Sequence, residues 1–284
     1  MERAVIRKFT ALEADVVCEC KTIKESIESS MYFHNHDGHE ILLVLSGILD
    51  LYTESGKIRL ERGDLVCVDE YCFHGADLIS NEKYDRVVIN IKGDYLEKLS
   101  SDQTNLAFCF SQDTSRSVRV IHLSEVEMEE MKRYAISLQE SLLGKKVGDD
   151  LRAEAFLKLI MVIIMHHFLN YEIPRPVETI PQLVKETFSY IEKHLTEEIT
   201  LKKLEDHVHH NGTYLSRCFK KTMGISLQQF IIVKKITLSC KLLKEGYSPC
   251  DACFMTGFNN YSNYSRTFSK QVGMSPKKYQ MKNR

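Results

Sequence analysis

The stretch YLSRCFKKTMGISLQQF, Tyr214–Phe230, returns in a weaker form as NYSRTFSKQVGMSPKKY, Asn263–Tyr279. When the first copy is moved by 49 residues onto the second, six identical residue types coincide. The pairs are Ser216 with Ser265, Arg217 with Arg266, Phe219 with Phe268, Lys221 with Lys270, Gly224 with Gly273, and Ser226 with Ser275. Six matches at one offset indicate a structural module that the chain uses twice.

Each copy has the pattern of a helix-turn-helix unit. A short helix is expected before a tight turn, at residues 209–212 in the first copy and 256–260 in the second, with a second helix after it. Arg217 precedes Phe219 by two residues, which is roughly 200° around a helix, so the arginine should face outward when the phenylalanine packs inward. An exposed helix with Arg, Lys, Ser and Thr can enter the major groove and contact phosphates and base edges.

The spacing of the two copies suits tandem sites on DNA. The segment 226–246 has apolar residues at helical spacing and is expected to form one helix of about 20 residues, about 30 Å long. Successive major-groove segments on one side of a duplex lie about 34 Å apart. The sequence therefore predicts two recognition helices that one stiff connector holds at a matching separation.

Residues 183–280 resemble the DNA-binding domain of the AraC/XylS family of transcriptional regulators. The resemblance is carried by ITLKKL, YLSRCFKKTMGISLQQF, KLLKEGYS and TGFNNYSNYSRTFSKQVGMSPKKY. It implies that the DNA-contacting residues are Thr213, Ser216 and Arg217 in the first unit and Tyr261, Ser262, Asn263 and Arg266 in the second, and we add the repeated lysines Lys221 and Lys270 as candidate phosphate contacts.

Three residues depart from the family pattern. Glu205 stands where a small alanine is usual beside the turn, Cys253 takes the equivalent place in the second unit, and Gln280 replaces a usual arginine. Because a carboxylate is larger than a methyl group and carries charge, Glu205 is expected to loosen the first unit or weaken its contact with DNA.

Charge is distributed unevenly along the chain. The overall formal charge is −1, yet residues 178–284 carry 17 basic and 9 acidic side chains, a net of +8, and the preceding part carries a net of −9. A basic domain favours a polyanionic partner, most simply double-stranded DNA. The nine cysteines, scattered along the chain, are typical of reduced thiols in the cytoplasm, and neither a long apolar run nor a signal sequence points to a membrane.

Proline marks the boundary between two predicted domains. YEIPRPVETIP, residues 171–181, holds three of the five prolines, so we place a linker at 173–181. Residues 1–172 begin with short alternating strands and end with a helical hairpin at about 124–169, whose second helix is apolar on more than one face and indicates a homodimer. The predicted fold is a two-domain α+β chain, with an N-terminal cupin-like β-barrel plus hairpin and an all-α double helix-turn-helix domain at 182–284.

The N-terminal domain contains a group of residues that suits metal or ligand binding. In HNHDGHEILLVLSG the side chains of His34, His36 and Glu40 share one face of a strand, and His74 follows at a distance. Three imidazoles and one carboxylate suit Zn²⁺, Ni²⁺, Fe²⁺ or Mn²⁺. The spacing is similar to that of the two cupin motifs, except that Asp69, Tyr71 and Leu78 replace a usual proline, glycine and asparagine. All three departures from the cupin pattern lie in the second motif.

Two interpretations of this group remain open at the level of sequence. In one, His34, His36, Glu40 and His74 hold a divalent metal. In the other, no cofactor is needed, and the same four residues with Tyr32 and Tyr52 bind a small-molecule effector directly.

The sequence favours a regulator over an enzyme. We expect a DNA-binding transcription factor that responds to a small effector, a sugar by family resemblance, and that acts with RNA polymerase as an activator of carbohydrate-related genes. The alternative is a metal-dependent cupin enzyme with an accessory helical domain. An RNA-binding or scaffolding protein is less well supported because aromatic-rich RNA motifs and RGG runs are absent.

Overall fold

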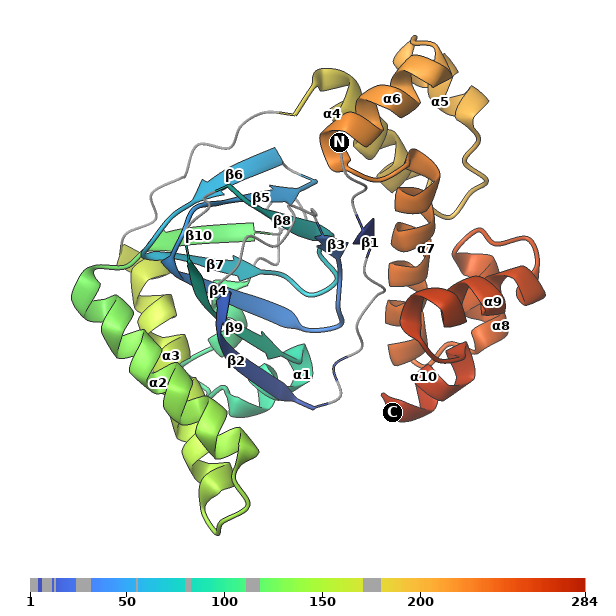
Figure 1. Cartoon of the computed structure of the whole chain (residues 1–284). Coiled ribbons are helices and arrows are strands. Elements are labelled where there is room, and N and C mark those ends of the chain that lie inside the picture. Colours follow the sequence, from blue (N-terminus) through green and yellow to red (C-terminus); the bar gives the residue numbers. More distant parts are fainter. Residues whose placement is uncertain are drawn as a thin grey trace. The chain divides into compact units, whose positions relative to one another are not determined.

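The computed structural model describes residues 5–6, 12, 14–23, 32–54, 56–79, 83–110, 118–170 and 180–283. The chain forms two compact units, one of residues 11–30 and 36–178 and the other of residues 1–10, 31–35 and 179–284 (Figure 1). The first combines strands with helices, and residues 180–283 of the second fold into helices, which confirms the predicted fold class. The predicted linker at 173–181 falls almost entirely outside the described residues.

The strands within the described residues form two five-stranded sheets. The first sheet has the order β1-β3-β8-β5-β6 and the second has the order β10-β7-β4-β9-β2. The strands are β1 (Val5–Ile6), β2 (Val16–Ile23), β3 (Tyr32–His34), β4 (His39–Ser46), β5 (Leu49–Thr53), β6 (Gly56–Leu60), β7 (Asp64–Val68), β8 (His74–Leu78), β9 (Tyr84–Ile91) and β10 (Val118–His122).

Alternation along β4 shows how the second sheet separates two apolar layers. Ile41 and Leu43 belong to a core that also contains residues of the helices α2 and α3, whereas Leu42 and Val44 belong to a second core formed by strand residues and Cys72 of the loop before β8. Successive side chains of a strand point to opposite faces, so one face of this sheet supports helices and the other lines the interior between the sheets. The site described below is built on the interior face.

Helices follow the strands and cover the second sheet. They are α1 (Gly93–Leu99), the short 3₁₀ helix η1 (Leu106–Cys109), α2 (Glu125–Leu143) and α3 (Asp149–Asn170). Ser124 and Glu127 form a capping box at the start of α2, where the predicted hairpin begins.

The helix α3 has the length and the apolar composition that a membrane-spanning helix would need. Its residues Leu157, Ile160 and Ile164 are buried in the core against the sheet, which explains much of that apolar character. Leu159, Val162 and Leu169 remain exposed. The helix is therefore a core helix with a second apolar face.

Seven helices form residues 180–283 of the C-terminal unit. They are α4 (Gln182–Lys193), α5 (Leu201–Val208), α6 (Gly212–Met223), α7 (Leu227–Lys244), α8 (Pro249–Met255), α9 (Tyr261–Val272) and α10 (Pro276–Lys282). The rings of Phe188, Phe219 and Phe230 meet at centroid distances of 5.0–5.4 Å and form the centre of the first half. Phe268 packs against Tyr264 and Tyr279 in the second half.

Candidate DNA-reading helices and sensor site

The helices α6 and α9 are two copies of one element. Each has 12 residues, and their first residues are 49 positions apart. Asn211 and Asn260 cap the N-termini through their side chains, which accept hydrogen bonds from Thr213 N–H and Asn263 N–H. Both helices end at a glycine in the left-handed region, with φ of 70° at Gly224 and 83° at Gly273. The sequence repeat is thus a repeat of helix boundaries.

The two helices bury and expose equivalent positions. Phe219 and Phe268 are completely buried, whereas Arg217 and Arg266 are exposed, as the angular separation of two residues predicts. The remaining predicted contact residues that are exposed are Thr213, Lys221, Tyr261, Ser262, Asn263 and Lys270, and Ser216 is half-buried. Both helices therefore present a polar outer face.

Glu205 fits into the turn of the first helix-turn-helix unit instead of loosening it. Its carboxylate accepts a hydrogen bond from the backbone N–H of Gly212, the first residue of α6. A Cβ atom at Gly212 would lie 2.5 Å from the carboxylate and 2.7 Å from Leu201 Cγ, so only glycine leaves room for this contact. The expected loosening was wrong because Glu205 and Gly212 fit each other, and the carboxylate stabilises the N-terminus of the helix.

Lys235 ties the two halves of the helical unit together, and sequence reasoning missed it. It lies on α7, is 7% exposed, and donates hydrogen bonds to the carbonyl oxygens of Glu197 and Gly257, each at 2.8 Å. Glu197 precedes the first helix-turn-helix and Gly257 lies in the turn of the second. The available signal was the pair Lys234 and Lys235 between the apolar residues Val233 and Ile236 of a core helix.

In the N-terminal unit, a carboxylate lies between two imidazoles. Glu40 Oε2 is 3.2 Å from His36 Nε2, and Glu40 Oε1 is 3.6 Å from His74 Nε2. All three side chains are buried. Glu40 is the second residue of β4, His74 begins β8, and His36 precedes β4, so the residues come together from two different sheets.

Burial and hydrogen bonding oppose each other in this group. Burial disfavours ionisation of Glu40, but the hydrogen bond with His36 and the close imidazole of His74 hold the pKa of its carboxyl well below the usual range. Burial likewise disfavours the charged form of His74, but the Cys72 side chain and the Glu40 carboxylate raise its pKa to about 10. Both shifts favour an ionised Glu40 beside a protonated His74.

The sequence-based site is only partly assembled. His34 lies on β3, in the compact unit that also contains residues 179–284, whereas His36, Glu40 and His74 lie together in the other unit. The side chain of Tyr32 lies outside the described residues. Tyr52 does not belong to the group: it is paired with Gly75 in the sheet, whereas Thr53 is paired with His74, so Tyr52 points to the opposite face.

The degraded second motif still supports the group. Tyr71, where glycine is usual, has φ of 62°, a left-handed conformation that non-glycine residues adopt less easily. Its backbone N–H donates to the carbonyl oxygen of His36 at 2.9 Å. The loop before β8 therefore stays attached to the first motif although its glycine has been replaced.

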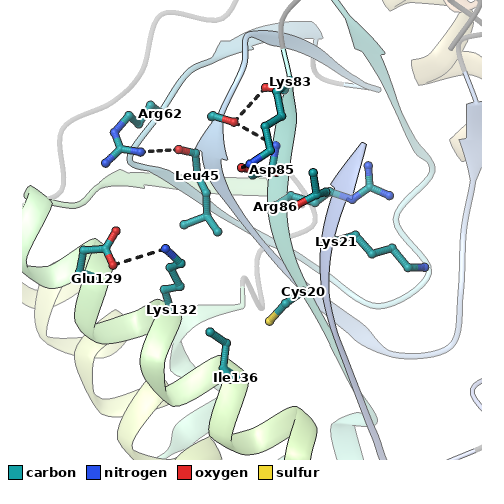
Figure 2. Close-up of a pocket in the computed structure, with 12 residues that line it drawn as sticks. Cys20, Lys21, Leu45, Arg62, Lys83, Asp85, Arg86, Glu129, Lys132 and Ile136 are labelled. Carbon is teal, nitrogen blue, oxygen red and sulfur yellow. Dashed lines mark hydrogen bonds and ion pairs between the residues drawn. The ribbon is translucent and has the colours of Figure 1, made fainter. Parts of the chain in front are cut away.

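A cavity of about 310 Å³ lies where the strands β2, β4 and β9 meet α2 (Figure 2). Cys20, Leu45 and Ile136 contribute its apolar wall. Its charged groups are largely paired with one another or with neighbours: Lys132 contacts Glu129, Lys83 contacts Asp85, and Arg62 donates to the Leu45 carbonyl and contacts Glu125. We therefore do not assign it as the sensor site.

Comparison with known families matches both units separately. A model of an AraC-like ligand-binding domain matches residues 20–161, and a model of a helix-turn-helix domain matches residues 204–282. The chain belongs to the AraC family of transcriptional regulators.

Curated relatives of this AraC-family chain have regulator names. An uncharacterized HTH-type transcriptional regulator, YbfI of Bacillus subtilis, is 29% identical over 81% of this chain and 80% of its own length. The probable transcriptional regulator LumQ of Photobacterium leiognathi is 24% identical over 90% of this chain and 94% of its own length. Family and relatives identify a transcriptional regulator rather than an enzyme, so the cupin enzyme alternative was wrong.

Among solved structures, ToxT from Vibrio cholerae is similar to this AraC-family chain. It matches over 95% of this chain and 99% of its own chain, with 12% identity and a TM-score of 0.40.

Proposed function

We propose that this AraC-family protein binds tandem major-groove sites through α6 and α9 and activates transcription in response to a small polar effector bound in the N-terminal unit. The observation that carries the proposal is the repeated pair of capped helices, each with a buried phenylalanine and an exposed arginine two residues before it. Arginine and lysine at the exposed positions provide phosphate contacts and, where geometry allows, guanine contacts.

The connector supports simultaneous use of both helices. The helix α7 has 18 residues, which corresponds to a length of about 27 Å. Lys235 on α7 fixes backbone segments of both halves. A rigid body with two reading helices suits two successive major-groove segments on one side of DNA, about 34 Å apart.

The side chains of the N-terminal unit also indicate which effector and which partners to test. The buried Glu40, His36 and His74 provide hydrogen-bonding groups that suit a hydroxylated ligand, so a sugar is the first class to test, with carbohydrate-related genes as targets. The exposed apolar residues Leu159 and Val162 on α3 favour a homodimer. RNA polymerase is the expected partner at the promoter and the cytoplasm the expected location.

The test is binding of the full chain to its own upstream DNA, measured by fluorescence anisotropy at several salt concentrations. We expect specific binding that weakens steeply as salt rises, because several phosphate contacts release counterions. A scrambled duplex of the same length and composition is the control. Equal affinity for both duplexes would contradict sequence-specific regulation, and a sugar-induced change of affinity would support the effector class.

A further inference from the structure

We propose that Cys250 and Cys253 form a reversible disulfide in the second helix-turn-helix unit and that this disulfide weakens DNA reading by α9. The sequence PCDAC, Pro249–Cys253, contains the spacing Cys-x-x-Cys. Two cysteines at this spacing are typical of redox-active dithiols and of zinc sites. A zinc site needs four ligands, and among the described residues no third histidine, cysteine or carboxylate joins these two thiols in a cluster. The pair is therefore a candidate dithiol, and only its regulatory consequence rests on the proposed function.

The two thiols lie on one side of α8. Cys250 is the second residue of this helix and Cys253 is the fifth. Residues three positions apart on a helix are neighbours, with Cβ atoms about 5–6 Å apart. A disulfide needs a Cβ separation of about 3.5–4.5 Å. The backbone N–H of Cys250, in the first turn, has no partner within the helix, so the start of α8 can tighten by the roughly 1–2 Å that the bond requires.

Burial gives the two thiols different roles. All nine cysteines lie in the part of the chain that the structure describes, and Cys250 alone among them is exposed. Cys253 is completely buried, and burial raises the pKa of its thiol. Cys250 is therefore the thiol that an oxidant in solution reaches first, and Cys253 is the thiol that completes the disulfide.

The oxidant is a small disulfide such as glutathione disulfide. The Cys250 thiolate attacks one of its sulfur atoms, so that a mixed disulfide forms and the first glutathione leaves as a thiolate. Cys253 then loses its proton to water and attacks the Cys250 sulfur, and the second glutathione leaves as a thiolate. Two protein thiols are oxidised, one glutathione disulfide is reduced, and the two glutathione molecules take up the two protons.

A chain of contacts connects Cys253 with the recognition helix of its unit. Its thiol lies 3.8 Å from the Phe258 carbonyl oxygen, and its own carbonyl oxygen accepts the Phe258 N–H at 3.1 Å. The ring of Phe258 contacts the ring of Tyr264 on α9, at a centroid distance of 5.4 Å. Tyr264 is completely buried. Movement of the Cys253 sulfur toward Cys250 breaks its contact with Phe258 and disturbs this support for α9.

Peptide mapping tests whether the disulfide forms. The full-length protein is reduced, freed of reductant, exposed to glutathione disulfide and then alkylated with N-ethylmaleimide. Both cysteines lie on one tryptic peptide, residues 245–266. We expect this peptide to escape alkylation, to weigh two hydrogen atoms less than the reduced peptide, and to recover both thiols after treatment with dithiothreitol.

DNA binding of the same preparations tests the consequence. The oxidised wild type should bind the upstream duplex about tenfold more weakly than the reduced protein, which corresponds to the loss of roughly one base contact. Dithiothreitol should restore the affinity. Oxidation should weaken Arg266→Ala less than Arg217→Ala, because Arg266→Ala has already lost the expected arginine contact of α9.

The variants Cys250→Ser and Cys253→Ala should bind DNA equally well with and without the oxidant. Cys253→Ala introduces the small residue that is usual at this place, and Cys250→Ser changes an exposed side chain, so both are expected to fold. Cys20→Ser, at a half-buried position of the N-terminal unit, is the matched control and should respond like the wild type.

Free thiols at both positions after oxidation, glutathione retained on Cys250, or an oxidised wild type that binds DNA as the reduced protein does would overturn the proposal. Loss of affinity on oxidation of Cys250→Ser would also overturn it. If the reduced wild type does not distinguish the upstream duplex from the scrambled one, the regulator proposal fails, and the peptide map still decides whether the disulfide forms.

Discussion

The first helix-turn-helix unit, α5–α6, and the second, α8–α9, begin and end their recognition helices alike but pack their turns with different side chains. In the first, Glu205 reaches the backbone N–H of Gly212. In the second, the equivalent Cys253 is fully buried, and its thiol donates weakly to the Phe258 carbonyl. A large polar residue is accommodated at this position because the residue opposite is glycine, so the two positions must be considered as a pair.

The largest expected effect tests whether the aromatic cores of the two helix-turn-helix units are equally well packed. Phe219→Ala and Phe268→Ala should each lower the free energy of unfolding of the helical unit by about 3–5 kcal/mol, because each leaves a cavity among buried aromatic rings. Urea unfolding followed by circular dichroism measures the change. Tyr214→Ala, at an exposed position, is the control and should cost less than about 0.5 kcal/mol. A wild-type midpoint for either phenylalanine variant would show that the units differ in packing.

Substitution of Lys235 tests whether its hydrogen bonds stabilise the packing of the two helix-turn-helix units against each other. Lys235→Met should cost about 2–3 kcal/mol of unfolding free energy, because the carbonyl groups of Glu197 and Gly257 lose a charged donor. Thermal unfolding measures it, with the exposed Lys241→Met on the same helix as control. If methionine proves as stable as lysine, the link between the units is apolar packing rather than these hydrogen bonds.

The exposed arginines test whether both units read DNA. Arg217→Ala and Arg266→Ala should each weaken specific DNA binding by about 1–3 kcal/mol if the arginine reads a base, with little change in stability. Anisotropy with the upstream duplex measures this, and the exposed Arg133→Ala on α2 is the control. Unequal losses would assign specificity mainly to one unit, and an unchanged affinity of Arg266→Ala would remove this residue from the DNA contacts.

The smallest expected effect concerns the turn of the first unit. Glu205→Gln keeps an acceptor for Gly212 N–H but removes a negative charge from the N-terminus of α6, so stability should fall by about 0.3–1 kcal/mol. Near DNA phosphates the same change should tighten binding by roughly two- to fivefold at low salt. Unfolding and anisotropy of one preparation measure both effects. Weaker DNA binding with unchanged stability would contradict this role of the carboxylate.

Local patterns were sufficient for the elements and for part of the site. The helical hairpin expected at about 124–169 and the helix expected at 226–246 are both present. The single strand expected for His34, His36 and Glu40 was wrong, because β3 ends at His34 and β4 begins at His39, so the bend between the strands brings His36 beside Glu40. Parity alone could not relate β5 to β8, so Tyr52 was assigned to the wrong face. The register between strands is set by long-range hydrogen bonds, which a local pattern does not contain.

The sequence by itself determined the repeated module, the two-domain organisation and the outward position of Arg217 and Arg266, because helix periodicity and caps act over only a few residues. Tertiary structure alone decided that Glu205 stabilises α6, that Lys235 joins two distant carbonyl groups, and that the Nε2 atoms of His36 and His74 both face Glu40. These features depend on close approach between segments far apart in the chain, where packing and burial determine which polar groups meet.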